Sequence, residues 1–159
     1  IEACKSSDMN YTIIRPPMVY GFNAPGNWLR LISLINLKIP LPFKNINNKR
    51  SFVFIGNLCD LIMTILNSEK SINKIFFVSD DEDISTSDLI DKISRRLKIF
   101  PRIFYVNKKF ILFFAKTVGK KSVINQLFES FQIDLSFTKE TLEWRPKYSI
   151  DEGIEKSLR

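Results

Sequence analysis

The residue in this chain best suited to holding an anion is the arginine at position 50. Arg50 follows the polar run 44–49 and precedes an apolar run that starts at Ser51, so we expect it at the beginning of a strand. A guanidinium binds phosphate through two parallel hydrogen bonds, which makes it the usual group for such ligands. Taken alone, however, the pattern favours an ordinary surface arginine at a strand start.

A second candidate for anion binding is Asn27, at the predicted start of a helix that runs to about Lys38. The first turn of a helix offers free backbone N–H groups and a partial positive charge to an anion. Asparagine is also a common helix cap, and the two roles are compatible. We therefore expect Asn27 to cap this helix, whether or not an anion binds there.

The segment 15–21, Arg-Pro-Pro-Met-Val-Tyr-Gly, follows the apolar run 11–14 directly. Its two prolines forbid helix and fix the backbone, and Gly21 permits a turn. This is how a buried parallel strand passes into a rigid loop at its carboxyl end, where ligands bind in open α/β sheets. The segment therefore indicates a ligand-facing loop.

Other catalytic side chains are scarce. The chain has no histidine, which removes the commonest general base and the commonest metal ligand, and we expect no metal site. Tyr105 and Lys109 have the spacing Tyr-x-x-x-Lys, but Tyr105 falls in a predicted strand at 102–106 and Asn107 resembles a helix cap between them. The two side chains would then not share a helix face, so we expect no catalysis there.

Apolar periodicity predicts a mixed order of strands and helices. We expect strands at 11–14, 51–55, 75–78 and 102–106, and helices ending near 9 and beginning at Asn27, Asn57, Ser85, Asn107 and Ser149. Ser85 with Asp88, and Ser149 with Glu152, have the spacing of capping boxes. The helix after Ser85 should bury Leu89, Ile90, Ile93 and Leu97. The strands are too few for a complete doubly wound sheet, so 11–14 and 75–78 should complete a sheet begun elsewhere.

Composition places the chain among globular proteins, with 159 residues, 45% of them hydrophobic, and a net charge of +7. Cys4 and Cys59 share no metal or redox spacing and suit a reducing compartment. Residues 92–121 carry ten Lys or Arg, interleaved with aromatics, and no acid. A solvated lysine-rich face over a Phe-rich core explains this stretch most simply. Of the functional alternatives, weak contact with an anionic membrane is favoured over nucleic acid.

Blocks spread over the whole chain resemble one family in their order. They are Arg15–Gly21, Gly26–Leu31, Leu41–Phe43, Asn48–Ile55 with Asn57, Leu58, Asp60 and Leu61, Phe76–Asp80 with Ile84–Thr86, the terminal set Ser130, Gln132, Asp134, Ser136, Lys139, Leu142, Trp144 and Pro146, and Glu152–Ile154. This pattern resembles the extended short-chain dehydrogenase/reductases, specifically the NAD-dependent epimerase/dehydratase family and its bacterial UDP-sugar 4-epimerase-like members.

The resemblance implies an α/β fold: the last strands of a Rossmann-type parallel sheet, from residues 1–26 and about 74–79, and a small α+β substrate lobe from the rest. It implies an NAD-dependent enzyme that epimerises C4 of a UDP-hexose or UDP-N-acetylhexosamine for surface polysaccharides, cytoplasmic and homodimeric at full length. The site residues it implies are Pro16 and Pro17 for the cofactor, and Met18, Asn27, Leu29, Arg50 and Asp134 for the substrate.

The chain also departs from the family pattern. The family's catalytic Tyr-x-x-x-Lys and its Gly-x-x-Gly-x-x-Gly cofactor loop precede the Arg-Pro-Pro block and are not found here, so the chain resembles a carboxyl-terminal half that is inactive alone. Met18 stands where many epimerases have asparagine, and Gln126 where many have a phosphate-binding arginine. A sibling dehydratase or reductase, or a catalytically empty remnant or binding module, therefore stays open.

Overall fold

Two small sheets, joined by the proline pair at 16–17, form the frame of the protein in the computed structural model, which describes residues 9–44, 46–106 and 128–159. The first sheet consists of β1 (Thr12–Arg15) and β4 (Lys74–Phe77), which run parallel from Thr12 opposite Lys74 to Arg15 opposite Phe77. The predicted strands 11–14 and 75–78 are thus confirmed, each shifted by one residue, and they pair with each other.

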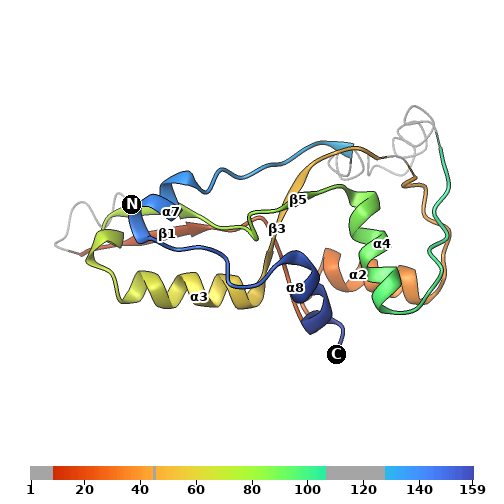
Figure 1. Ribbon diagram of the computed structural model, residues 1–159, viewed down its shortest axis with the longest axis horizontal. Helices are drawn as coiled ribbons and strands as arrows, with labels where there is room; N and C mark the ends of the chain where they lie inside the picture. The colour runs from red at the N-terminus through yellow and green to blue at the C-terminus, as the bar shows by residue number, and fades with distance from the viewer. Residues whose placement is uncertain (1–8, 45, 107–127) are drawn as a thin grey trace.

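The β1–β4 sheet is covered by two helices. α3 (Ile55–Leu66) packs Leu61 and Ile65 toward it, and α7 (Ser136–Leu142) contributes Leu142; both meet the buried Phe76. Figure 1 shows the ribbon of β1 running between α3 and α7. The short 3-10 helix η1 (Glu69–Ser71) leads from α3 into β4.

The second sheet has β3 (Arg50–Phe54) at its centre. β2 (Met18–Tyr20) lies parallel to β3, and β5 (Asp83–Ile84) lies antiparallel on the other side. Three helices close the core around this sheet, and they lie together at the right of Figure 1: α2 (Asn27–Asn36), α4 (Thr86–Arg96) and α8 (Ile150–Ser157). The core here is aromatic and aliphatic, with Tyr20, Trp28, Phe54, Ile90 and Ile154 all buried.

The helix starts show which of the predicted capping residues are present in the structure. Both capping boxes are present as predicted, Ser85 with Asp88 and Ser149 with Glu152. The helix start at Asn27 is confirmed, but the predicted cap by Asn27 and the predicted start at Asn57 are wrong. Gly26, with φ 86°, precedes α2, so Asn27 is the first helical residue and makes no side-chain cap. α3 begins at Ile55, and Asn57 is buried in its first turn. There its side-chain amide forms hydrogen bonds with residues far away in the sequence.

The predicted strand at 102–106 is also wrong, because only Ile103 forms a bridge there, to Leu41. Beyond this bridge the pairing continues irregularly, with Lys44 N donating to Phe104 O at 3.3 Å. Leu89, Ile90 and Ile93 are buried as expected, whereas Leu97 is half-buried at the end of α4. The predicted helices at 1–9 and 107–118, and Cys4, lie outside the described residues.

Candidate functional site

A hollow of about 450 Å³ lies just beyond the carboxyl end of β1, and we call it the Arg50 hollow. Its lining consists of Pro17, Met18, Arg50, Glu129, Ser130 and Phe131. The proline pair ends β1 and turns the chain into β2, which places Met18 next to the start of β3 because these strands are parallel. Segments far apart in the sequence thus converge where ligands bind in α/β sheets.

The far wall of the Arg50 hollow is held by backbone pairing. Phe131 forms a bridge with Arg50, its N–H donates to Lys49 O at 2.8 Å, and its carbonyl accepts from Ser51 N at 2.8 Å. Ser130 adds its hydroxyl oxygen, which accepts from Lys49 N at 3.1 Å. Glu129 is carried into the hollow by this pairing. The sequence analysis did not identify Glu129, because nothing local indicates that 129–131 lies beside β3.

The Arg50 guanidinium is the main charge in the Arg50 hollow. Arg50 is half-buried, and this burial lowers the pKa of its guanidinium, while the neighbouring Glu129 carboxylate acts in the opposite direction. A partly desolvated cation interacts with an anion more strongly than a fully solvated one. The hollow therefore combines an anion-binding group with a carboxylate that would compete with an incoming anion.

A second hollow, of about 500 Å³, adjoins the first through Met18, which lines both. We call it the Asn27 hollow, because it lies at the start of α2 and includes Asn27 and Trp28. The first turn of α2 contains no acidic residue and no side-chain cap. The buried Trp28 indole N–H has no hydrogen-bond partner among the described residues. The backbone N–H groups of this first turn and the Trp28 indole therefore place hydrogen-bond donors and a partial positive charge beside the Asn27 hollow.

The structure thus brings together some of the expected site residues and not others. Pro17, Met18 and Arg50 share the Arg50 hollow, and Asn27 is next to it. Pro16 is exposed. Leu29 is 44% exposed on α2 and does not line the described parts of either hollow.

Asp134 has a local structural role. The exposed Asp134 carboxylate accepts hydrogen bonds from Ser136 Oγ at 2.6 Å and Ser136 N at 2.8 Å, at the start of α7. These bonds hold the pKa of the Asp134 carboxyl below its usual value. Asp134 lies apart from the described lining of the Arg50 hollow. Tyr105, the tyrosine of the rejected Tyr-x-x-x-Lys match, is 64% exposed and outside any strand, and Lys109 lies outside the described residues.

A buried polar cluster adjoins the Asn27 hollow, because the Tyr20 ring packs against Trp28 with ring centroids 4.9 Å apart. The Asp80 carboxylate accepts hydrogen bonds from Tyr20 Oη at 2.7 Å, Phe54 N at 2.8 Å and Asn57 Nδ2 at 2.7 Å. Asn57 in turn accepts from Tyr148 N at 2.9 Å and donates to Tyr148 O at 2.8 Å. We call the side chains of Tyr20, Asn57 and Asp80, with the backbone groups of Phe54 and Tyr148, the Asp80 cluster. It fixes the end of β2 to the end of β3.

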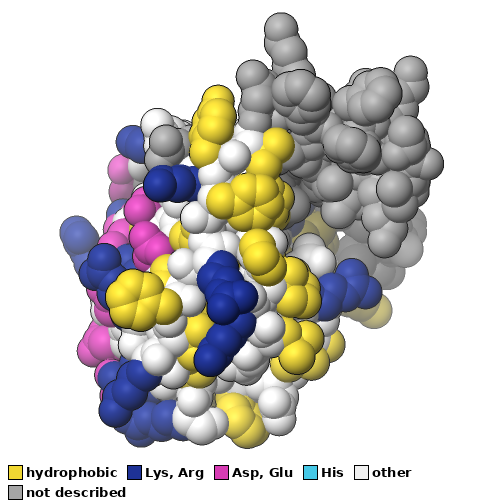
Figure 2. Space-filling view, turned by 90° about the vertical axis from the view of Figure 1, so that its right-hand side faces the viewer, with side chains coloured by type: hydrophobic (Ala, Val, Ile, Leu, Met, Phe, Trp, Pro, Cys, Tyr) yellow, Lys and Arg dark blue, Asp and Glu magenta, His cyan; other side chains and the backbone are white. Residues whose placement is uncertain are grey.

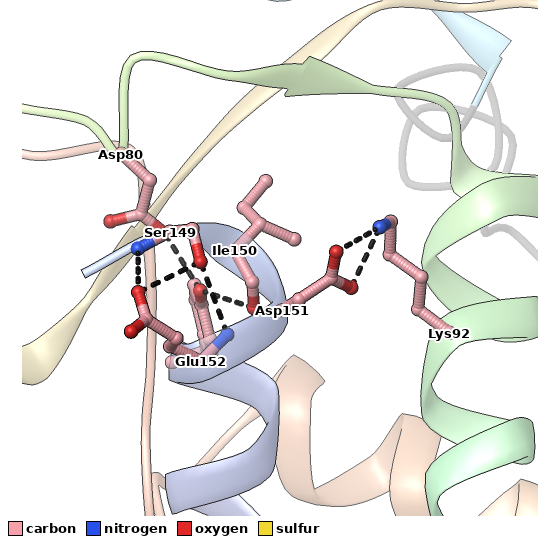
Figure 3. Close-up of polar contacts among 7 residues, drawn as sticks. Asp80, Lys92, Ser149, Ile150, Asp151 and Glu152 are labelled. Atoms are coloured by element: carbon pink, nitrogen blue, oxygen red, sulfur yellow. Dashed lines mark hydrogen bonds and ion pairs between the residues drawn. The ribbon is translucent and has the colours of Figure 1, made fainter.

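Burial dominates the electrostatics of the Asp80 cluster. Desolvation raises the pKa of the Asp80 carboxyl, although the three donors act against this, and desolvation together with Asp80 raises the pKa of the Tyr20 hydroxyl. Figure 3 shows Asp80 beside the capping box of α8, and Lys92 paired with Asp151 on the opposite side of that helix start. The sequence signal for the cluster was the polar pair Ser79-Asp80 directly after a buried strand.

Comparison with known proteins supplies relatives over the whole chain. No family model matches it. The chain is 37% identical over 160 residues to a UDP-glucose 4-epimerase of Vibrio cholerae, covering 100% of this chain and 49% of that protein. It is 27% identical over 158 residues to the chloroplast stem-loop binding protein of 41 kDa b of Arabidopsis thaliana, covering 94% of this chain and 39% of that protein. The chain thus spans about half the length of these relatives.

Solved structures show the same fold. The UDP-glucuronic acid 4-epimerase of Bacillus cereus, in complex with UDP-glucuronic acid and NAD, matches with a TM-score of 0.73 at 20% identity, over 97% of this chain and 46% of that one. The UDP-glucose 4-epimerase of Thermotoga maritima, with UDP-glucose, matches with a TM-score of 0.70 at 17% identity, over 98% of this chain and 47% of that one. Both are Rossmann-fold epimerases, which confirms the expected fold class. The sequence similarity and the fold thus agree with the expected resemblance to the epimerase/dehydratase family of extended short-chain dehydrogenase/reductases, over about half the length of the proteins matched.

Proposed function

We propose that the full-length protein is an NAD-dependent nucleotide-sugar 4-epimerase acting on a UDP-hexose or UDP-N-acetylhexosamine for surface polysaccharides, and that residues 1–159 supply its sugar-nucleotide pocket. The observation that carries the proposal is the half-buried Arg50 in one hollow with Pro17 and Met18, at the carboxyl end of β1. The 37% identity to a UDP-glucose 4-epimerase supports it.

In this proposal Arg50 pairs with the diphosphate through its guanidinium fork. Met18, which lines both hollows, and Asn27, which lines the second, would contact the rest of the sugar nucleotide. The roles of Leu29 and Asp134 in substrate binding stay predictions, because neither lines the described parts of these hollows.

NAD, when bound, would accept a hydride from the sugar and return it. This chain's contribution to the cofactor site would be a rigid wall: Pro16 and Pro17 carry no N–H groups and lie at the carboxyl end of β1. The five glycines of the chain do not form a Gly-x-x-Gly-x-x-Gly loop, so the cofactor's pyrophosphate would be held by residues outside 1–159.

The proposal includes the expected division of the chain. Residues 1–26 and about 74–79 would complete the Rossmann sheet, and the rest would form mainly the substrate lobe. The parallel pairing of β1 with β4 supports the first part. None of the helices in the described part of the chain is both long and apolar enough to cross a bilayer. A cytoplasmic location and a homodimer stay predictions.

The decisive experiment is calorimetric titration of the full-length protein with UDP and with NAD. We expect Arg50→Ala to weaken UDP binding about ten- to a hundredfold, since a charge-assisted hydrogen bond contributes ~1.5–3 kcal/mol, and to leave NAD binding unchanged. Arg50→Lys should recover only part of the affinity, because a point charge cannot form the bidentate fork. Arg145→Ala, at an exposed arginine, is the control. Equal UDP affinity in wild type and Arg50→Ala would refute the proposed pocket.

One alternative activity has a specific observation in its favour. A dTDP-glucose 4,6-dehydratase of Bacillus anthracis also matches the fold, with a TM-score of 0.63 at 16% identity over 91% of this chain. Incubation of the full-length protein with UDP-glucose and with UDP-N-acetylglucosamine, followed by NMR of the products, separates the possibilities. Inversion at C4 of either sugar indicates the epimerase, a 4-keto-6-deoxy sugar indicates the dehydratase, and both substrates unchanged with intact UDP binding indicates a binding module.

A further inference from the structure

The helices α2 and α4 end in the same way at one end of the molecule. α2 is followed by Leu37-Lys38-Ile39 and α4 by Leu97-Lys98-Ile99. Both lysines have left-handed backbones, with φ 53° at Lys38 and 56° at Lys98. The chain then runs on as two segments joined by hydrogen bonds, Leu41 N to Arg102 O at 2.8 Å and Phe104 N to Leu41 O at 3.0 Å. This pairing holds both helix ends on one surface.

Apolar side chains project from this surface instead of entering the core. Phe100 is 95% exposed, Leu37 71% and Ile39 40%, and the exposed cations Lys38, Lys98 and Arg102 alternate with them along the chain. We call these six residues the basic apolar end. Figure 2 views this side of the molecule and shows hydrophobic side chains directly beside Lys and Arg. The simplest sequence interpretation, a Phe-rich core beneath a solvated face, does not hold for Phe100.

Most of the charge around the basic apolar end is positive. Segments 37–44 and 95–106 contain six Lys or Arg and no Asp or Glu. One of the six, Arg96, is paired with Glu155 of α8, and Asp83, Asp88 and Asp91 line a separate hollow at the border, together with Pro101 and Ile103. Figure 2 shows acidic side chains along one edge of this view. The surface is therefore complementary to an anionic partner.

We propose that the basic apolar end docks on the surface of an anionic lipid bilayer. Exposed lysines and arginines gain free energy near anionic headgroups, and an exposed phenylalanine with flanking aliphatics gains more by entering the boundary between headgroups and acyl chains. Leu37 and Ile39 distinguish a bilayer from nucleic acid, because aliphatic side chains cannot stack on bases as aromatic ones do. The proposal is independent of the nucleotide-sugar pocket, since it uses other residues.

The test is vesicle sedimentation with the full-length protein, so that every segment adjoining residues 1–159 is in place. The vesicles consist of phosphatidylcholine alone or of phosphatidylcholine with phosphatidylserine. We expect binding only to the second kind, weakened by salt. Each lysine contributes about fivefold in affinity, so Lys38→Gln with Lys98→Gln should weaken binding about thirtyfold. Phe100→Ser should weaken it about tenfold or more, by removing the inserted ring.

Matched controls keep this test specific. Arg145→Gln removes an exposed cation elsewhere, and Met63→Ser removes an apolar side chain that is 58% exposed on α3; both should bind vesicles as the wild type does. The replaced side chains are exposed, and circular dichroism checks that each variant is folded. If the folded wild-type protein does not bind vesicles that contain phosphatidylserine, the proposal is wrong. Tighter binding to an RNA stem-loop than to the vesicles, unaffected by Phe100→Ser, would overturn it in favour of nucleic acid.

Discussion

Arg50 and Glu129 line the same hollow with opposite charges, so an incoming diphosphate must compete with a carboxylate for the guanidinium. We predict that Glu129→Gln tightens UDP binding by the full-length protein, up to about fivefold, because a partly exposed charge pair is worth up to ~1 kcal/mol. The amide keeps the size of the side chain. Titration calorimetry measures the change, with Glu140→Gln on the surface of α7 as the control. Unchanged or weaker UDP binding would show that Glu129 does not compete.

Asp80 carries a carboxyl whose pKa burial raises above its ordinary 3.8. Between that value and its raised value, the folded protein holds more protons than the unfolded chain, so this group's contribution to stability falls as pH rises through the window. Asparagine does not titrate, so Asp80→Asn should lack this pH dependence. We predict that the free energy of unfolding of wild type, minus that of Asp80→Asn, decreases as pH rises and becomes constant above the raised pKa of Asp80.

Denaturant unfolding of the full-length protein across a pH series tests this prediction. Asp134→Asn provides a control of opposite sign, because the pKa of Asp134 is lowered and its contribution is lost as pH falls. If the stabilities of wild type and Asp80→Asn stay parallel from pH 3.8 upward, burial does not perturb Asp80.

At the scale of elements, α8 lies against β2 and β3 through a glycine. A methyl group on Gly153 would overlap the Tyr20 hydroxyl and approach Phe54 Cβ to 3.1 Å. Alanine is normally the better residue inside a helix by ~1 kcal/mol. Here we predict the reverse: Gly153→Ala should destabilise by about 1–3 kcal/mol, the usual cost of overpacking a core.

A double-mutant cycle with Tyr20→Phe isolates the cause of that cost. Removing the hydroxyl relieves the closest contact, so Gly153→Ala should cost less in the Tyr20→Phe background than in wild type. Equilibrium denaturation of the four proteins gives the coupling. A stabilising Gly153→Ala would mean that α8 can shift away from β2 without loss, and an equal cost in both backgrounds would mean that the cost does not come from the Tyr20 hydroxyl.

Local elements were predictable, and long-range partners were not. The capping boxes of α4 and α8 follow from residues three positions apart, so sequence alone identified them. Asn57 also resembled a cap, but its amide bonds Asp80 and Tyr148, which are 23 and 91 residues away. The order of blocks along the chain indicated Met18 and Arg50 as site residues. Glu129 could not be inferred, because its position depends on the pairing of Phe131 with β3.

For the whole molecule, the β1–β4 sheet is the incomplete part. Parallel sheets are stable when several strands pair and both faces are covered, whereas this one has two strands among the described residues. Leu66 at 72% exposure, Ile72 and Phe77 are further apolar groups of this region left at the surface. The shape of this region fits a surface on which more strands and helices would pack.

We therefore predict that residues 1–159, expressed alone, are poorly stable and show no NAD-dependent epimerase or dehydrogenase turnover. Unpaired strand edges and exposed apolar faces should give a broad melt, and they should favour association of chains. Calorimetry with sedimentation measures stability and association, and NADH absorbance with product NMR measures turnover. A sharp cooperative melt of a monomer contradicts the first expectation, and measurable turnover contradicts the second.

The hydrogen bonds between Asn57 and Tyr148 also constrain the order in which the protein can fold. They join residues 91 positions apart, so most of the chain must be synthesised before Asn57 can be satisfied. Until then Asn57, and through it Asp80, must stay hydrated. Closing so long a loop costs entropy before any contact repays it, which slows folding. The segment around Tyr148 therefore acts late in folding, because Asn57 reaches its final hydrogen bonds at the ends of β2 and β3 only after residue 148 has been synthesised.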